Sequence, residues 1–128
     1  MLTIQRESNL SAEDFCALAF AAWGVELDES SMAAALLKTI NISARCDRLL
    51  VGTARILTDG YLFGTVPEVM VHPDHRGRGV ARGLMETLWE ESPTGLFFGA
   101  QEGLEGFYES LGYERSLTSF QKRKKRSS

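Results

Sequence analysis

The chain has 128 residues and a formal net charge of −3, with 44% hydrophobic and 24% charged residues. This length is usual for one domain with a real core, and the acidic balance disfavours a nucleic-acid-binding domain, which is normally basic. No apolar run approaches the roughly 20 residues of a membrane span, the N-terminus lacks a signal-peptide core, and the two cysteines have no metal-ligand spacing. We therefore expect a cytoplasmic single domain over 1–128, with reduced cysteines and no metal site.

The first half of the chain predicts a strand, two helices and a meander of short strands. A capping-box pattern at Ser11–Asp14 begins the first helix, and Gly24 ends it. Asp28–Ser31 supplies caps for the second helix. A two-residue link predicts a tight hairpin between the next two strands. The expected elements are a strand at Leu2–Arg6, a helix up to Gly24, a helix at Met32–Ile40, strands at Ile42–Cys46 and Leu49–Leu57, and an extension of the meander at Tyr61–Phe63.

The second half predicts alternating strands and helices, with a breaker at Ser92–Gly95 between the first helix and the next strand. The helix between two of these strands is a crossover, which implies at least one parallel pair in a mixed sheet. The expected elements are a strand at Val69–Val71, an amphipathic helix up to Glu91, a buried strand at Leu96–Ala100, a helix over Leu104–Leu111 closed by Gly112, a last strand at Leu117–Phe120, and a basic, frayed tail over Lys122–Ser128. One α/β domain, of mixed α+β character, follows.

A glycine-rich turn between the strand at Val69 and the following helix predicts an anion site. Gly77 and Gly79 remove side chains where a phosphate needs close approach to backbone N–H groups. Arg76, Arg78 and Arg82 add positive charge. The pattern is neither a P-loop nor GxGxxG, so nucleotide hydrolysis and nicotinamide binding are disfavoured. His72 and His75 flank the turn and are expected to be solvated or on the phosphate side rather than catalytic.

The chain resembles the GNAT superfamily of acyl-CoA-dependent N-acyltransferases in three motifs that occur in the family's order. Arg76–Ala81, reading RGRGVA, is similar to the family's Q/R-x-x-G-x-G/A signature and follows the strand end VMVHPDH. Val51–Ile56, reading VGTARI, resembles the family's third strand. Gly106–Glu114, reading GFYESLGYE, resembles its final motif, a helix that carries a tyrosine followed by LGY or LGF. The resemblance extends from Leu49 to about Phe120.

The resemblance implies a GNAT fold, in which a twisted mixed sheet is flanked by helices and two splayed strands bind acetyl-CoA. The strands that would splay are Glu68–His72 and Leu96–Ala100. Met70 and Val71 would pair their backbone with pantetheine, and an N–H near either one would stabilise the oxyanion. The residues expected to bind the pyrophosphate are Arg76, Gly77, Arg78, Gly79, Val80 and Ala81. Gln101 stands near the position where many members carry an asparagine, and its amide would serve pantetheine or the acceptor.

Two residues match catalytic positions of the family. Tyr108 matches the usual general acid, which protonates the departing thiolate, while its competing interpretation is one more aromatic on a buried helix face. Glu68 is the candidate base, and its alternative is an edge carboxylate that only attracts a cationic substrate. The family implies direct transfer in a ternary complex, and neither Cys16 nor Cys46 falls in a matched motif.

The acceptor is expected to be a primary amine, small or in a peptide, bordered by Trp23–Ser31 and Tyr61–Glu68. Four carboxylates on this side favour a cationic amine: Glu26, Asp28, Glu29 and Glu68. Homodimers are frequent in the family. The rival interpretation is a non-catalytic acyl-CoA-binding or sensing module, which needs neither Tyr108 nor Glu68. A more distant alternative, disfavoured by the net charge, is a protein- or RNA-binding module that uses the arginines and the basic tail.

Overall fold

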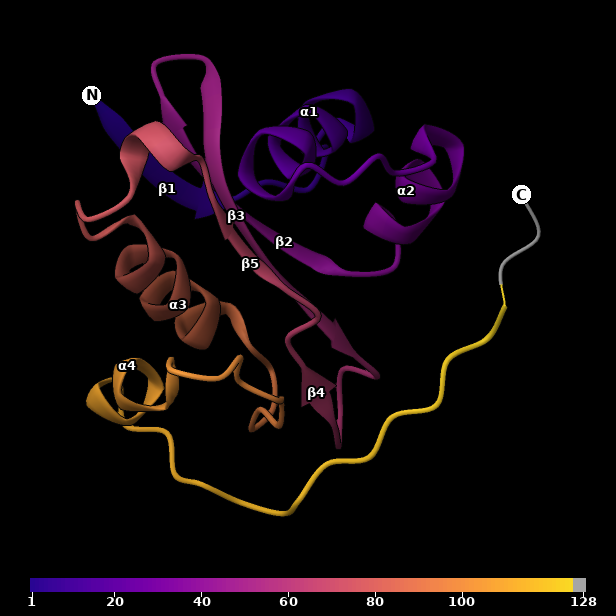
Figure 1. The fold of residues 1–128 in the computed structure, drawn as a ribbon, viewed down its shortest axis with the longest axis vertical. Helices are drawn as coiled ribbons and strands as arrows, with labels where there is room; N and C mark the ends of the chain where they lie inside the picture. Colours follow the sequence, from indigo (N-terminus) through magenta and orange to yellow (C-terminus); the bar gives the residue numbers. More distant parts are fainter. Residues whose placement is uncertain (126–128) are drawn as a thin grey trace. The chain divides into compact units, whose positions relative to one another are not determined.

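A computed structural model describes residues 1–125 of the chain, so the predicted tail lies partly outside the described residues. The chain divides into two compact units, Met1–Phe98 and a second that begins at Gly99, and each is described by itself. The first unit contains, in order, β1 (Leu2–Arg6), α1 (Ala12–Trp23), α2 (Glu29–Leu36), β2 (Ile40–Cys46), β3 (Leu49–Thr58), β4 (Gly64–Thr65), β5 (Val69–Val71), the 3-10 turn η1 (Pro73–His75) and α3 (Val80–Glu91) (Figure 1). The second contains α4 (Glu105–Ser110). None of the helices seen over 1–125 is long and apolar enough to cross a membrane.

The sheet of the first unit is antiparallel at every described pairing. β1, β2 and β3 follow one another, and the other edge of β3 pairs with β4 and then with β5. Helices α1 and α2 lie on one face of this sheet and α3 on the other (Figure 1). Because helices cover both faces, the sheet is the middle layer of an α/β sandwich, which confirms the predicted α/β class.

The caps predicted for the first two helices are correct, but α2 begins at Glu29, three residues before the predicted Met32, and its predicted end is also wrong. The Ser11 hydroxyl accepts the N–H of Asp14 at 3.2 Å, and α1 ends at Gly24. Asp28 caps α2, but this helix stops at Leu36 instead of continuing to residue 40, where β2 begins. The cause is a side chain of the next strand, because the Asn41 amide donates to the Leu36 carbonyl at 2.9 Å and so terminates the helix.

Three predicted strands are absent from the described residues. Tyr61–Phe63 forms a turn, because Asp59 Oδ1 accepts all three of its N–H groups at 2.8–3.1 Å. Leu96–Ala100 is irregular and partly exposed, and Phe97 donates its N–H to the Gly64 carbonyl at 2.9 Å. Without that strand, the described sheet has no parallel pair. Leu117–Phe120 is also irregular and exposed. Neither Leu96–Ala100 nor Leu117–Phe120 has a neighbouring strand among the described residues. No ladder of hydrogen bonds therefore offsets the conformational entropy lost when the chain is extended.

The main apolar core lies between the sheet and the pair of helices α1 and α2. Its buried members come from both helices, the link before α1 and strands β3 and β5: Leu10, Phe15, Leu18, Ala19, Met32, Leu36, Leu50 and Met70. On the opposite face α3 approaches β3 closely at Gly52. A Cβ there would lie 3.0 Å from the side chains of Val80 and Leu84. The glycine of the VGTARI motif therefore lets the N-terminal turn of α3 pack directly on the sheet.

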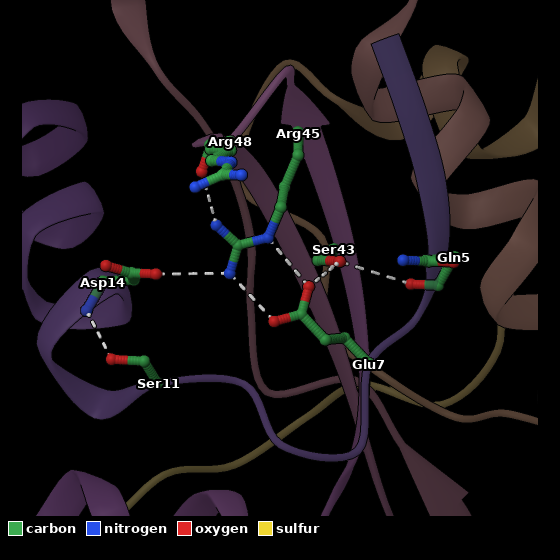
Figure 2. A network of polar contacts seen from close by, with 7 residues as sticks. All are labelled: Gln5, Glu7, Ser11, Asp14, Ser43, Arg45 and Arg48. Atoms are coloured by element: carbon green, nitrogen blue, oxygen red, sulfur yellow. Dashed lines mark hydrogen bonds and ion pairs between the residues drawn. The ribbon is translucent and has the colours of Figure 1, made fainter.

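A polar network ties β1, β2 and α1 together (Figure 2). The Arg45 guanidinium donates to both carboxylate oxygens of Glu7 at 2.9 and 2.8 Å, to Asp14 at 3.2 Å and to the Arg48 carbonyl at 2.8 Å. The Ser43 hydroxyl adds a bond to Glu7 at 2.7 Å. Hydrogen bonds from Arg45 are the chief cause that lowers the pKa of Glu7, against the raising effect of its burial. The ionised carboxylate is therefore part of the fold.

Candidate active site

The register of β5 decides which of its backbone groups face away from the sheet. The His72 N–H donates to the Val51 carbonyl at 2.7 Å, so these two residues form a hydrogen-bonded pair. Met70 lies opposite Thr53, two positions along, and by the alternation of an antiparallel ladder it also bonds to β3. The N–H and C=O of Val71 then point away from β3. Met70 and Val71 are both predicted to pair their backbone with pantetheine. Of the two, Val71 has backbone groups that face away from β3, so it is the one that can make this contact.

An extra residue before β5 sets the position of Glu68. β3 has two residues between the partners of Thr65 and Val69, whereas the returning chain has three, so the strand bulges around Pro67. Proline has no N–H to give to a ladder, which suits this break. The bulge brings Glu68 opposite Arg55 of β3. The Arg55 guanidinium donates to both carboxylate oxygens of Glu68, at 2.5 and 2.7 Å.

The Arg55–Glu68 ion pair is largely shielded from water. The two side chains are 11% and 16% exposed, and the guanidinium lies 5.5 Å from the centre of the Phe15 ring of α1. A bidentate pair between an aromatic ring and a strand holds the carboxylate in one orientation. Each carboxylate oxygen still has a second lone pair, so Glu68 can accept a further hydrogen bond from a water or an amine.

Sequence reasoning identified Glu68 and overlooked Arg55. The signal was present, because Arg55 is the one charged residue in the strand that reads LLVGTARILT. A charge in an otherwise buried strand requires a partner. The carboxylate of the next apolar segment, PEVMV, is the partner that the structure supplies.

The turn between β5 and α3 has the geometry of an anion site. Gly77 and Gly79 have φ of 76° and 80°, a left-handed conformation that side chains with a Cβ rarely adopt. Gly79 is the N-cap of α3, and no side chain among residues 1–125 caps this helix. The first turn, Val80–Gly83, also carries no acidic residue. The positive end of the helix dipole and its first N–H groups therefore have no side-chain cap among the described residues, an arrangement that favours a negatively charged ligand.

The arginines of this turn differ in what they contact. The Arg76 side chain donates to the carbonyl of Val71 at 3.2 Å and to that of Ala22, in the last turn of α1, at 3.0 Å. Arg78 is exposed, and within residues 1–125 its guanidinium makes no such bond. His75 lies with its Nδ1 3.8 Å from the sulfur of Cys46. The three groups thus occupy different surroundings although they are close in sequence.

Tyr108 and Gln101 belong to the second unit. The Tyr108 ring stacks edge-on against Phe107 at 5.1 Å and against Tyr113 at 6.2 Å. Burial raises the pKa of Tyr108, so the phenol keeps its proton at neutral and mildly alkaline pH. The helix that carries it ends in a Schellman motif, in which the N–H of Gly112 bonds to Glu109 and that of Tyr113 to Tyr108. Gln101 is exposed, and its carbonyl accepts the N–H of Leu104 at 3.0 Å.

Comparison with known proteins identifies the class. The chain matches the acetyltransferase (GNAT) domain over residues 33–115, which covers all three motifs. The chain belongs to the GNAT family and is an acyltransferase.

The fold agrees with solved acetyltransferases. A probable acetyltransferase from meticillin-resistant Staphylococcus aureus superposes with a TM-score of 0.80 at 16% identity, over 96% of this chain and 100% of that one. The ribosomal-protein-S18-alanine N-acetyltransferase of Escherichia coli gives 0.76 at 19% identity, over 91% and 80%. AAC(6')-Iy, solved with the bisubstrate analogue CoA-S-monomethyl-acetylneamine, gives 0.74 at 16% identity, over 98% and 99%. At these identities the likeness shows the fold alone.

Proposed function

We propose that this GNAT acyltransferase moves the acetyl group of acetyl-CoA to a primary amine by direct transfer in a ternary complex. The observation that carries the proposal is the turn between β5 and α3. It combines two glycines of positive φ, a helix N-terminus without a side-chain cap, and exposed positive charge. In a chain of this family, the anion that suits such a turn is the pyrophosphate of CoA.

In the proposed complex, backbone N–H groups of Gly77–Ala81 bind the pyrophosphate, and Arg78 adds charge. The outward N–H and C=O of Val71 bond to the pantetheine arm beside the open edge of β5, and Gln101 contributes its amide. Donor and acceptor held in this way react as an intramolecular pair, so much of the rate enhancement is positional.

The proposed reaction forms a C–N bond and breaks a C–S bond. Glu68, held by Arg55, takes a proton from the ammonium acceptor directly or through water, and the amine attacks the thioester carbonyl. An outward N–H of β5 stabilises the negative oxygen. Tyr108 gives its proton to the departing thiolate, and burial suits this role because it keeps the phenol protonated.

The carboxylates on the acceptor side support a cationic acceptor less strongly than the sequence alone suggests, because two of them already have partners in the protein. Asp28 accepts from Ser31 N–H and Oγ at 3.0 and 2.6 Å, so it is used as the cap of α2. Glu68 is neutralised by Arg55. Glu26, before α2, and Glu29, its first residue, form no ion pair among the described residues. We propose an amine acceptor without requiring a second positive charge.

Release of free thiol from acetyl-CoA, measured against a panel of primary amines, tests the proposal. The panel should include polyamines, amino acids, aryl amines, aminoglycosides and peptides with free N-termini. The account expects release with at least one amine and acetylated amine in equal amount by mass spectrometry. Binding of acetyl-CoA with no release for any amine supports the sensing module instead.

A further inference from the structure

Arg76, the first arginine of the turn, donates hydrogen bonds from its side chain to two backbone carbonyls of the protein. Arg76 Nε donates to the Val71 carbonyl at 3.2 Å and Nη2 to the Ala22 carbonyl at 3.0 Å. These two carbonyls belong to different elements, the end of β5 and the last turn of α1. One guanidinium therefore joins the glycine turn and the neighbouring end of β5 to α1, which is 54 positions away in the sequence.

Both bonds are physically favourable for a cation. The Ala22 carbonyl lies in the last turn of α1, where carbonyls have no helical partner and the dipole is negative. That turn carries no basic residue of its own. The Val71 carbonyl faces the open edge of β5, so a donor on that side satisfies it without competing with β3. A planar guanidinium can span the two in a fixed geometry, which a lysine cannot.

Arg78, two residues on, provides the contrast. Both arginines are exposed, but the Arg78 side chain, unlike that of Arg76, forms no hydrogen bond within the described residues. Two of the five N–H donors of Arg76 are engaged by the two carbonyls, whereas all five donors of Arg78 are available to a phosphate.

We propose that Arg76 is a positioning residue, which fixes the glycine turn and the edge of β5 to the end of α1, and that Arg78 is the one of the two that pairs with phosphate. The kinetic consequence of this role for Arg76 rests on the proposed function. Since α1 leads directly into the segment before α2, which borders the acceptor in the proposed complex, Arg76 also joins the donor side to the acceptor side.

Arg76→Gln and Arg78→Gln form a matched pair, and two donors distinguish them. Acetyl-CoA carries phosphates, whereas S-acetylpantetheine carries the same thioester without any. In Arg78→Gln, the ratio of kcat/KM for acetyl-CoA to that for S-acetylpantetheine should fall about tenfold, the value of one charge-assisted hydrogen bond. In Arg76→Gln, kcat/KM should fall for both donors, and the ratio should stay within about twofold of wild type. A ratio that falls equally in both variants overturns the proposal.

Amide hydrogen exchange of the protein without donor tests the link independently of turnover. Arg76→Gln should speed exchange in the last turn of α1, at the Gly24 amide that bonds to the Phe20 carbonyl at 2.8 Å, while Arg78→Gln should not. Unchanged exchange at Gly24 in Arg76→Gln refutes the link. If Arg76→Gln fails to fold, Arg76→Lys, which keeps the charge but not the fork, should show the same pattern in smaller degree. A wild-type protein that releases no thiol refutes the proposed function and leaves the exchange result to decide on Arg76.

Discussion

Removing the Arg55 guanidinium should destabilise the first unit more than removing any exposed charge. Arg55→Met keeps most of the apolar stem of the side chain and deletes both donors to Glu68. The carboxylate is then left only 16% exposed with no counter-charge. A buried ion that loses its partner keeps its desolvation penalty and loses its compensation.

The expected loss of unfolding free energy follows from how deeply the Arg55–Glu68 pair is buried. Breaking a fully buried pair costs about 3–5 kcal/mol, and the remaining exposure of 11% and 16% places this pair near the lower limit, at about 3 kcal/mol. Glu68→Gln keeps one acceptor oxygen and should cost about 2 kcal/mol. The double variant leaves no unpaired charge, so its cost should be below the sum, with a coupling of about 2 kcal/mol.

Urea unfolding of the four proteins measures these free energies. The exposed pair Arg6–Glu91, at 3.4 Å with 47% and 38% exposure, supplies the control. Arg6→Met should change the free energy of unfolding by no more than about 0.5 kcal/mol. Two results would contradict a shielded Arg55–Glu68 pair. One is an Arg55→Met variant that loses no more unfolding free energy than Arg6→Met, and the other is a coupling energy with Glu68 near zero.

Three further predictions concern packing, pH and catalysis. Gly52→Ala should cost about 1–3 kcal/mol by thermal unfolding, because its methyl meets two α3 side chains at 3.0 Å and a backbone carbonyl at 3.2 Å. Gly95→Ala, which meets nothing within 4 Å, is its control, and equal losses contradict the packing argument. The lowered pKa of Glu7 means that its ionised form stabilises the fold above its ordinary pKa and that this stability is lost as pH falls through the lowered value. The stability difference between wild type and Glu7→Gln should therefore shrink on acidification from about pH 6 to about pH 3, and a constant difference excludes this linkage. Tyr108→Phe should lower turnover about 100-fold or more at all pH values below the raised pKa of the phenol, and unchanged turnover rules out its role as acid.

Features governed by neighbouring residues could be predicted from the sequence. The start of α1 at Ser11, the turn with Gly77 and Gly79, and the end of α4 before Gly112 all depend on caps and on backbone conformations of single residues. Such signals act within one helical turn and need no partner from elsewhere. The prediction of an anion site rests on the same local signals.

Features that depend on distant partners could not be predicted in the same way. Leu96–Ala100 is apolar enough for a strand, yet a strand needs a neighbour, and the described segment forms no ladder, although Phe97 donates its N–H to the Gly64 carbonyl. The ion pair of Arg55 with Glu68 depends on the extra residue at Pro67, because a change of one in register decides which side chains face each other. Sequence spacing alone does not reveal that register.

The two bonds of Arg76 have the same origin. Its place in the family motif suggested a phosphate contact, and the carbonyl of Ala22 that it binds is 54 positions away in the chain. No local pattern joins them. The structure thus separates two arginines that the motif treats alike.

A crystal structure of the complex with CoA tests the central claim most directly. We expect pyrophosphate oxygens within hydrogen-bond distance of backbone N–H groups of Gly77–Ala81, and the pantetheine arm bonded to Val71 along the open edge of β5. A pyrophosphate bound elsewhere on the protein, or a pantetheine arm away from β5, would contradict it.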